Sequence, residues 1–145
     1  IRVKQAEKRH FADPSIACSL LNIKEASKLI NDLETFGLLF EALVERDLKI
    51  YADSFNAKCY HYQDYQNREI DSVIELENGE WCAFEIKLGA HKIEEGAKNL
   101  LKIKEEILKA KGKAPSVLCV ICGLSNAAYQ RTDGVYVVPI TALKP

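Results

Sequence analysis

The sequence predicts an α/β domain in which a mixed central sheet is flanked by helices on both faces. An amphipathic helical pattern over residues 32–55 precedes three strand patterns, and a second amphipathic helix over 92–111 follows them. A strongly apolar strand and a final short strand complete the order helix, three strands, helix, two strands. Hairpins at the start and a helical crossover later place antiparallel and parallel pairs in one sheet.

The composition is that of one globular domain. The chain has 145 residues, 48% hydrophobic and 28% charged, and a domain of this size needs no disulfide or metal to be stable. With 20 basic and 21 acidic residues, net charge gives no general attraction to nucleic acid or membrane, so a nucleic-acid site must be a local patch. No apolar run approaches the roughly 18 residues of a membrane span. Five scattered cysteines favour reduced thiols and a cytoplasmic protein.

Helices are expected through the first third of the chain. Asp13 and Pro14 predict a helix start, because Asp is a good N-cap and Pro suits the first turn. A second short helix is expected over 23–30. In the long helix of residues 32–55, Gly37 costs about 1 kcal/mol and marks a candidate break. The apolar residues that recur there at helical spacing are Phe36, Phe40, Leu43, Val44, Leu48 and Tyr51.

Five strands are expected, and the second of them carries an informative alternation. Ile70 and Ile74 should face the core, whereas Asp71 should point away from it together with Val73. The expected strand ranges are 58–65, 69–76, 80–88, 116–122 and 135–138.

The hairpin between the second and third strands fixes a register. A two-residue loop would put Asp71 opposite Ile86, on the wrong face. A three-residue loop over 77–79 puts Asp71 opposite Glu85 and makes both faces consistent. We therefore predict a type I turn with Gly79 as its left-handed bulge residue.

In that register, Asp71, Glu85 and Lys87 share one face of the sheet. Two carboxylates this close repel each other unless a cation lies between them. Mg²⁺ or Mn²⁺ prefers such oxygen ligands, and a metal-bound water beside Lys87 is suited to attack on a phosphodiester. The alternative is a solvated strand face with a surface ion pair between Glu85 and Lys87.

The pattern of Asp71 followed by Glu85-x-Lys87 on the next strand resembles the PD-(D/E)xK nuclease superfamily, which is restriction-endonuclease-like in fold. The superfamily core order αβββαβ matches the order expected here. The resemblance implies that Asp71, Glu85 and Lys87 are catalytic and that Glu41, on the long helix, joins Asp71 and Glu85 as a ligand of Mg²⁺ or Mn²⁺. Ile70 precedes Asp71, at the position where the superfamily motif has proline.

More narrowly, the chain looks like the C-terminal domain of archaeal and bacterial AAA-type ATPases of uncharacterised role. This resemblance implies that residues 1–8 are a linker from an upstream ATPase and winged-helix part, and that residues 9–145 are the nuclease-like domain. The sequence contains no methionine, in keeping with an excised domain, and no glycine-rich phosphate loop, so we expect no nucleotide site in it. The resembling stretches are 11–15, 31–41, 68–71, 84–89 and 133–139.

Other charged and aromatic residues have both a functional and a structural interpretation. Lys92, Lys98 and Lys102 lie on the second long helix. They either contact the phosphate backbone of a nucleic acid, with DNA favoured, or form a solvated face. Glu69 and Glu75 are further ligands or solvated charges, and Glu45 competes with Glu41 for the same role. Three tyrosines either stack bases or pack in the strand: Tyr60, Tyr62 and Tyr65.

Cysteine and histidine give weaker signals. Cys119 and Cys122 have metal-site spacing, but they should point to opposite faces of an apolar strand and act as core residues. The three histidines are dispersed along the sequence and support no histidine-based catalytic site: His10, His61 and His91.

Two functions from different classes follow. The first is a Mg²⁺- or Mn²⁺-dependent nuclease domain fused to an ATPase. The second is a catalytically silent nuclease-like scaffold that binds nucleic acid, a partner protein or its own upstream ATPase. A homo-oligomer formed through the apolar strand near 135–138 is compatible with either, and no membrane partner is expected.

Overall fold

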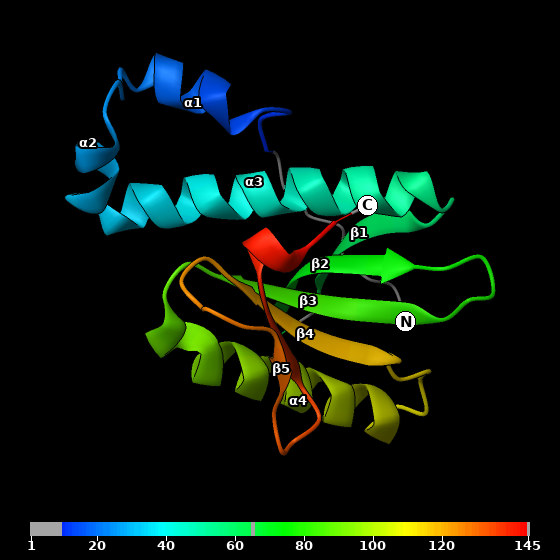
Figure 1. Cartoon of the computed structure of the whole chain (residues 1–145). Coiled ribbons are helices and arrows are strands. Elements are labelled where there is room, and N and C mark those ends of the chain that lie inside the picture. The colour runs from blue at the N-terminus through cyan, green and yellow to red at the C-terminus, as the bar shows by residue number, and fades with distance from the viewer. Residues whose placement is uncertain (1–9, 65, 145) are drawn as a thin grey trace.

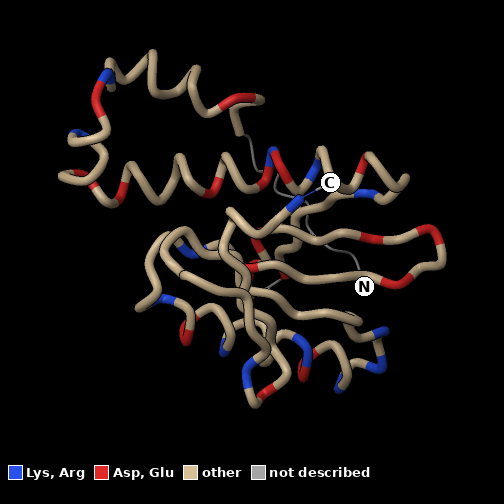
Figure 2. The backbone as a smooth tube through the Cα atoms, in the orientation of Figure 1, with Lys and Arg blue, Asp and Glu red and all other residues tan. Residues whose placement is uncertain are grey.

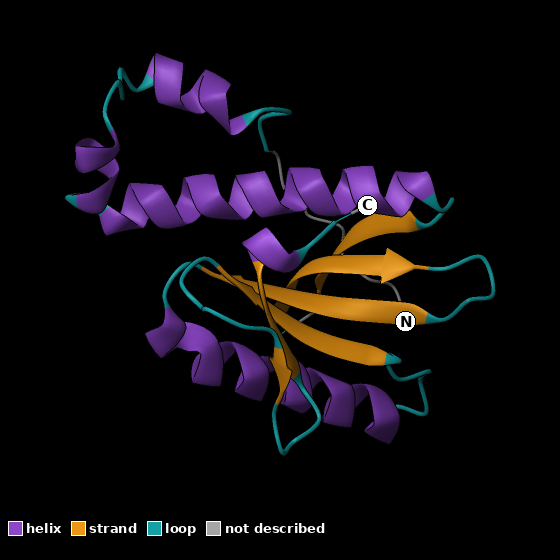
Figure 3. Ribbon diagram, in the orientation of Figure 1, coloured by secondary structure: helices purple, strands orange, loops and turns teal. Residues whose placement is uncertain are grey.

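A six-stranded mixed sheet lies at the centre of the domain, with helices on both faces (Figure 1 and Figure 3). The computed structural model describes residues 10–64 and 66–144, so the predicted linker over 1–8 and Tyr65 lie outside the described residues. The strand order is β1-β2-β3-β4-β6-β5, antiparallel at both ends and parallel for β3–β4 and β4–β6. The strands are β1 (Lys58–Gln63), β2 (Glu69–Glu75), β3 (Trp81–Lys87), β4 (Val117–Cys122), β5 (Tyr129–Gln130) and β6 (Tyr136–Pro139). The expected α/β fold, with a mixed sheet between helices, is confirmed.

The two long helices cover opposite faces of this sheet, and the two short ones lie on the outer side of α3 (Figure 3). The helices are α1 (Pro14–Leu20), α2 (Ala26–Ile30), α3 (Leu33–Ser54) and α4 (Ile93–Lys109), with 3₁₀ turns at Ala90–Lys92 and Ile140–Ala142. The Asp13 side chain accepts the amide of Ser15 at 2.8 Å, which confirms the predicted N-cap. Gly37 does not break α3. No helix within the described residues is long and apolar enough to cross a membrane.

A separate hydrophobic core fills each side of the sheet. Phe40, Val44 and Leu48 of α3 pack on one face, and Ala97 and Leu100 of α4 pack on the other. The central strand β4 is therefore buried on both sides. Its two cysteines fall in different cores, as predicted: Cys119 on the α3 side and Cys122 on the α4 side.

The hairpin between β2 and β3 has the predicted register. Ser72 pairs with Phe84, and Ile74 pairs with Cys82. The amide of Gly79 donates to the carbonyl of Leu76 at 2.9 Å, and Gly79 has a φ of +78°. The three-residue loop with a left-handed Gly79 is thus confirmed.

A bulge in β2 changes the direction of its side chains. Tyr60 of β1 pairs with Val73 and Tyr62 pairs with Ile70, so two β2 residues lie opposite one residue of β1. Ile70 and Val73 pack in the α4-side core, and Ile74 packs in the α3-side core. The prediction that Ile70 and Ile74 share a face, opposite Val73, was wrong, because the bulge at residues 71–72 reverses the alternation.

The last strands form an edge hairpin that contains one element not expected from the sequence. The two-residue β5 pairs with β6 at Tyr136 and Val137, while β4 pairs with β6 on its other side. At these two residues β6 is thus covered on both sides, which leaves less of its edge for subunit pairing near 135–138 than the sequence suggested.

Candidate functional site

The β2 bulge and the end of β3 bring Asp71, Glu85 and Lys87 together. The Asp71 carboxylate accepts the main-chain amide of Ile86 at 2.8 Å. The last main-chain pair between β2 and β3 joins Ser72 and Phe84. Beyond it, the Asp71 side chain takes the place of a main-chain acceptor for the Ile86 amide. The Lys87 Nζ atom lies 3.1 Å from Glu85 Oε2. The three residues predicted to be catalytic therefore form one cluster.

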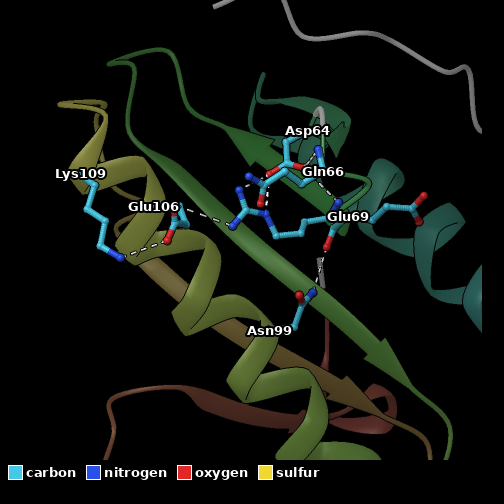
Figure 4. Close-up of polar contacts among 7 residues, drawn as sticks. Asp64, Gln66, Glu69, Asn99, Glu106 and Lys109 are labelled. Atoms are coloured by element: carbon cyan, nitrogen blue, oxygen red, sulfur yellow. Dashed lines mark hydrogen bonds and ion pairs between the residues drawn. The ribbon is translucent and has the colours of Figure 1, made fainter.

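Glu85 is buried, with only 3% of its surface exposed, on the face of the sheet that α4 covers. Gly96 lets α4 approach closely there, since a Cβ atom at this position would lie 3.4 Å from Glu85 Cβ and from Lys87 Cγ. Asn99 lies one turn further along α4, and its amide group donates to the Glu85 carboxylate and to the Glu69 carbonyl at 2.9 Å. Figure 4 shows Asn99 reaching from α4 to β2.

The environment of Glu85 disfavours its charged form. Burial, and then repulsion by Asp71, raise the pKa of Glu85 to about 7, although Lys87 and Asn99 oppose the rise. Burial alone would lower the pKa of Lys87, but the charges of Glu85 and Asp71 outweigh it and raise the pKa. Glu85 therefore holds a proton more readily than an exposed glutamate does, and a divalent cation at the site would displace that proton.

Glu41 lies on α3, close to Glu45, which competed with it for the same predicted role, and to His10, which was not predicted to belong to a site. Ligand atoms of His10, Glu41 and Glu45 all lie within 4.8 Å of one another. His10 Nε2 is 2.6 Å from Glu45 Oε2. No sequence signal links His10 to α3, because His10 and Glu41 are 31 positions apart and no motif joins them.

The candidate phosphate-contacting lysines are exposed but interspersed with acidic residues along α4 (Figure 2). Lys92 pairs with Glu95 at 3.0 Å, and Lys98 pairs with Glu94 at 3.3 Å. Lys102 is exposed on the same helix. The three lysines therefore lie on one helical stretch and form a mixed-charge face.

The remaining candidates have more ordinary surroundings. Tyr60 is 43% exposed, whereas Tyr62 packs against the α4-side core. The exposed Glu69 side chain accepts a hydrogen bond from Gln63 at 3.0 Å. Glu75 is exposed at the end of β2.

Asn99 is a site residue to which no sequence motif pointed. The available signal was its spacing, since residues three apart on a helix share a face, and Gly96 marks the place where α4 must approach the sheet. The amide is the group that connects the buried carboxylate of β3 to the main chain of β2.

Two of the cavities formed by the described residues lie near the sheet. The larger, about 650 Å³, is bounded by Tyr62, Arg68, Trp81 and Glu106, and Glu85 does not line it. Its charged wall contains the Asp64–Arg68 pair and Glu106, which contacts Arg68 and Lys109 (Figure 4). The smaller, about 560 Å³, lies between α3 and β1–β2 and is lined by Asp71. Of the cluster, Asp71 lines the smaller cavity, whereas Glu85 and Lys87 lie against α4 and line neither cavity.

The fold and this cluster define an α/β domain with a buried carboxylate–lysine group on its central sheet. Residues 36–143 match the family model of a domain of unknown function, DUF4143. The chain belongs to this family, which is found in AAA-ATPase-associated proteins. The matched range contains Asp71, Glu85, Lys87 and Asn99, whereas His10 precedes it. Searches of curated proteins and of solved structures gave no significant match.

Proposed function

We propose that this domain is a nuclease of the PD-(D/E)xK type, in which Asp71 and Glu85 hold Mg²⁺ or Mn²⁺ for hydrolysis of a phosphodiester bond. The observation that carries the proposal is the buried Glu85 carboxylate beside both Asp71 and Lys87. A buried carboxylate with its pKa near 7 costs stability. Such arrangements cluster at functional sites, where the chemistry requires them.

The donor set fits a hard divalent cation. Two carboxylates supply oxygen ligands and the charge that such a cation needs. When bound, the ion supplies an activated water and polarises a phosphoryl oxygen. Glu41 lies beside His10 and Glu45 on the α3 side, and we assign Asp71 and Glu85 alone to this ion.

The chain's own residues have separate roles in this proposal. Lys87 holds the attacking water or stabilises charge on the phosphate through its ammonium group. Asn99 is a positioning residue, because it fixes the Glu85 carboxylate against α4. The Ile86 amide does the same for Asp71.

The proposed substrate is nucleic acid, with DNA favoured by the superfamily resemblance. Lys92, Lys98 and Lys102 would contact its backbone from the 3₁₀ turn and α4 that follow Lys87. An upstream ATPase part of the same protein would deliver the substrate, and the cytoplasm is the compartment we propose.

A silent scaffold that binds a partner is the second candidate, and one observation favours it. Each oxygen of Glu85 already has a protein donor, Asn99 for Oε1 and Lys87 for Oε2. The lysines at the start of α4 are likewise paired with acidic residues. Because its carboxylate oxygens already have protein hydrogen-bond donors, such a site keeps its geometry without a metal.

Metal-dependent cleavage of labelled DNA and RNA separates these candidates. The wild-type chain should cleave with Mn²⁺, and Asp71→Asn, Glu85→Gln and Lys87→Met should each reduce the rate at least about a hundredfold. Glu75→Gln is the matched control, because Glu75 is exposed on the same strand as Asp71. Equal cleavage by all variants would identify a contaminating nuclease, and no cleavage by a folded wild-type chain favours the scaffold.

A further inference from the structure

We propose that His10, Glu41 and Glu45 form a second metal site, for a transition-metal ion such as Zn²⁺, on the α3 side of the sheet. None of the three residues belongs to the group of Asp71, Glu85 and Lys87, so this proposal does not rest on the nuclease function. The site draws on two elements, the segment before α1 and the long helix α3.

The helix fixes two of the three ligands. Glu41 and Glu45 are four residues apart within α3, so their side chains lie one turn apart on the same face. Both are partly buried, and the Glu45 side chain is 17% exposed. The middle of a 22-residue helix is a rigid support for a ligand pair.

The segment before α1 brings the third ligand to this face. His10 Nε2 lies 2.6 Å from Glu45 Oε2. Asp13 caps α1 and lies 3.7 Å from Arg46 of α3, which holds the start of α1 beside the helix. The imidazole is therefore placed against Glu45 by the packing of α1 on α3.

The distances suit one ion. Ligand atoms bind Zn²⁺ at about 2.0–2.2 Å, so two ligands of the same ion lie at most about 4.4 Å apart. Ligand atoms of the three residues lie within 4.8 Å of one another. Because His10 Nε2 and Glu45 Oε2 are only 2.6 Å apart, closer than two ligands of one tetrahedral Zn²⁺, this pair has to open as the ion binds. Two carboxylates balance the charge of a divalent ion.

The presence of His10 among the ligands indicates which class of metal ion this site would bind. Imidazole nitrogen suits Zn²⁺ and other transition-metal ions, whereas Mg²⁺ and Ca²⁺ prefer ligand sets made only of oxygen. Mg²⁺ at Asp71 and Glu85 would differ in kind from this ion, whereas Mn²⁺ and Zn²⁺ accept both ligand sets, so variants of the ligands separate the two sites.

The site borders the cavity of about 560 Å³ between α3 and β1–β2. His10, Glu45, Asp71 and Ser72 are all among the residues that line it. Three protein ligands leave a coordination position for water, which is the arrangement of zinc sites that act on a ligand rather than only support a fold.

Zn²⁺ and Co²⁺ titrations of the full 145-residue chain test the proposal. We expect one equivalent of Zn²⁺ by calorimetry and a Co²⁺ spectrum with d–d bands and no thiolate charge-transfer band. His10→Ala and Glu45→Gln should each weaken binding by about tenfold or more, because each removes a ligand. His91→Ala is the matched control, since His91 is an exposed histidine outside the cluster, and it should bind as the wild type does.

Asp71→Asn and Glu85→Gln separate this site from the proposed nuclease site, because both should retain the Zn²⁺ equivalent. Urea unfolding of each variant checks that lost binding does not reflect lost folding. The proposal is overturned if the wild-type chain binds no stoichiometric Zn²⁺, if folded His10→Ala binds as tightly as the wild type, or if Co²⁺ shows thiolate ligation, as through Cys59 of the same cavity.

Discussion

Replacement of Glu85 by glutamine should change how the stability of the domain depends on pH. Glutamine has the size of glutamate and stays neutral at every pH. Burial and the Asp71 charge raise the pKa of Glu85 from its ordinary 4.5 to about 7 in the folded protein. The folded state therefore binds a proton more tightly than the unfolded state does between these two pH values.

The sign and the size of the effect follow from that difference. The stability from protonated Glu85 is fully present below pH 4.5 and is lost as the pH rises through about 7. At about 1.4 kcal/mol per pH unit, a rise from 4.5 to about 7 corresponds to about 3 kcal/mol. Relative to the wild type, Glu85→Gln should therefore become more stable by about 3 kcal/mol between pH 4.5 and pH 8. The raised pKa of Lys87 affects only alkaline pH, outside this window.

Urea unfolding at a series of pH values, followed by the fluorescence of Trp81, measures this difference. Trp81 is the single tryptophan, and its indole nitrogen donates to the carbonyl of Lys113 at 3.0 Å, so its signal reports the folded hairpin. Glu75→Gln serves as the control, since Glu75 is exposed, and it should show no comparable pH dependence. A difference between Glu85→Gln and wild type that stays flat from pH 4.5 to 8 would refute the account of the buried carboxylate.

Three further predictions concern positions around the site and the turns. Asn99→Ala should destabilise the domain by about 2 kcal/mol at pH 8 and raise the pKa of Glu85 further, because a buried carboxylate loses a donor; the pH titration of stability would show both changes. Asp64→Asn should lower the free energy of unfolding by about 2 kcal/mol near neutral pH, as measured by urea unfolding. Burial raises the pKa of Asp64, but the Arg68 and Gln66 main-chain amides and the Arg68 guanidinium outweigh it and hold this pKa below 3.8. That cost should shrink as the pH falls below 3.8, where wild-type Asp64 takes up its proton. Gly79→Ala should lower the free energy of unfolding by about 1 kcal/mol in the same assay because φ is +78°. Gly37→Ala, in the second turn of α3 and with no atom within 4 Å of the added Cβ, should raise it by up to about 1 kcal/mol, and equal effects at the two glycines would contradict this reasoning.

The order of elements and the hairpin register were predictable because they depend on local signals. Alternation in β3 placed Glu85 and Lys87 on one face, and a left-handed glycine suited the three-residue loop. Amphipathic spacing gave α3 and α4 to within a residue or two. These features depend on residues that are close together in the sequence, so they can be recognised in a single sequence.

The bulge in β2 and the edge strand β5 were not predictable in the same way. Ser72, Val73 and Ile74 are all buried because both faces of the sheet are covered, so hydrophobicity does not reveal where the alternation reverses. The two residues of β5 are too few for a pattern, and their pairing depends on β6.

The site was predictable only in its β-sheet part. Asp71, Glu85 and Lys87 follow from strand pairing, whereas Asn99 and His10 reach their partners through the packing of helices. Contacts between elements far apart in the chain depend on how α4 and α1 dock, and no single segment encodes that.

Calorimetric titration with Mn²⁺ tests the central claim most directly, because a contaminating nuclease cannot mimic a stoichiometric heat. The account predicts that the wild-type chain binds Mn²⁺ and that Asp71→Ala and Glu85→Ala lose this binding while remaining folded. His10→Ala should keep it, since that residue belongs to the other proposed site. A folded wild-type chain that gives no Mn²⁺ heat, or alanine variants that bind as the wild type does, would contradict the assignment of Asp71 and Glu85 as metal ligands.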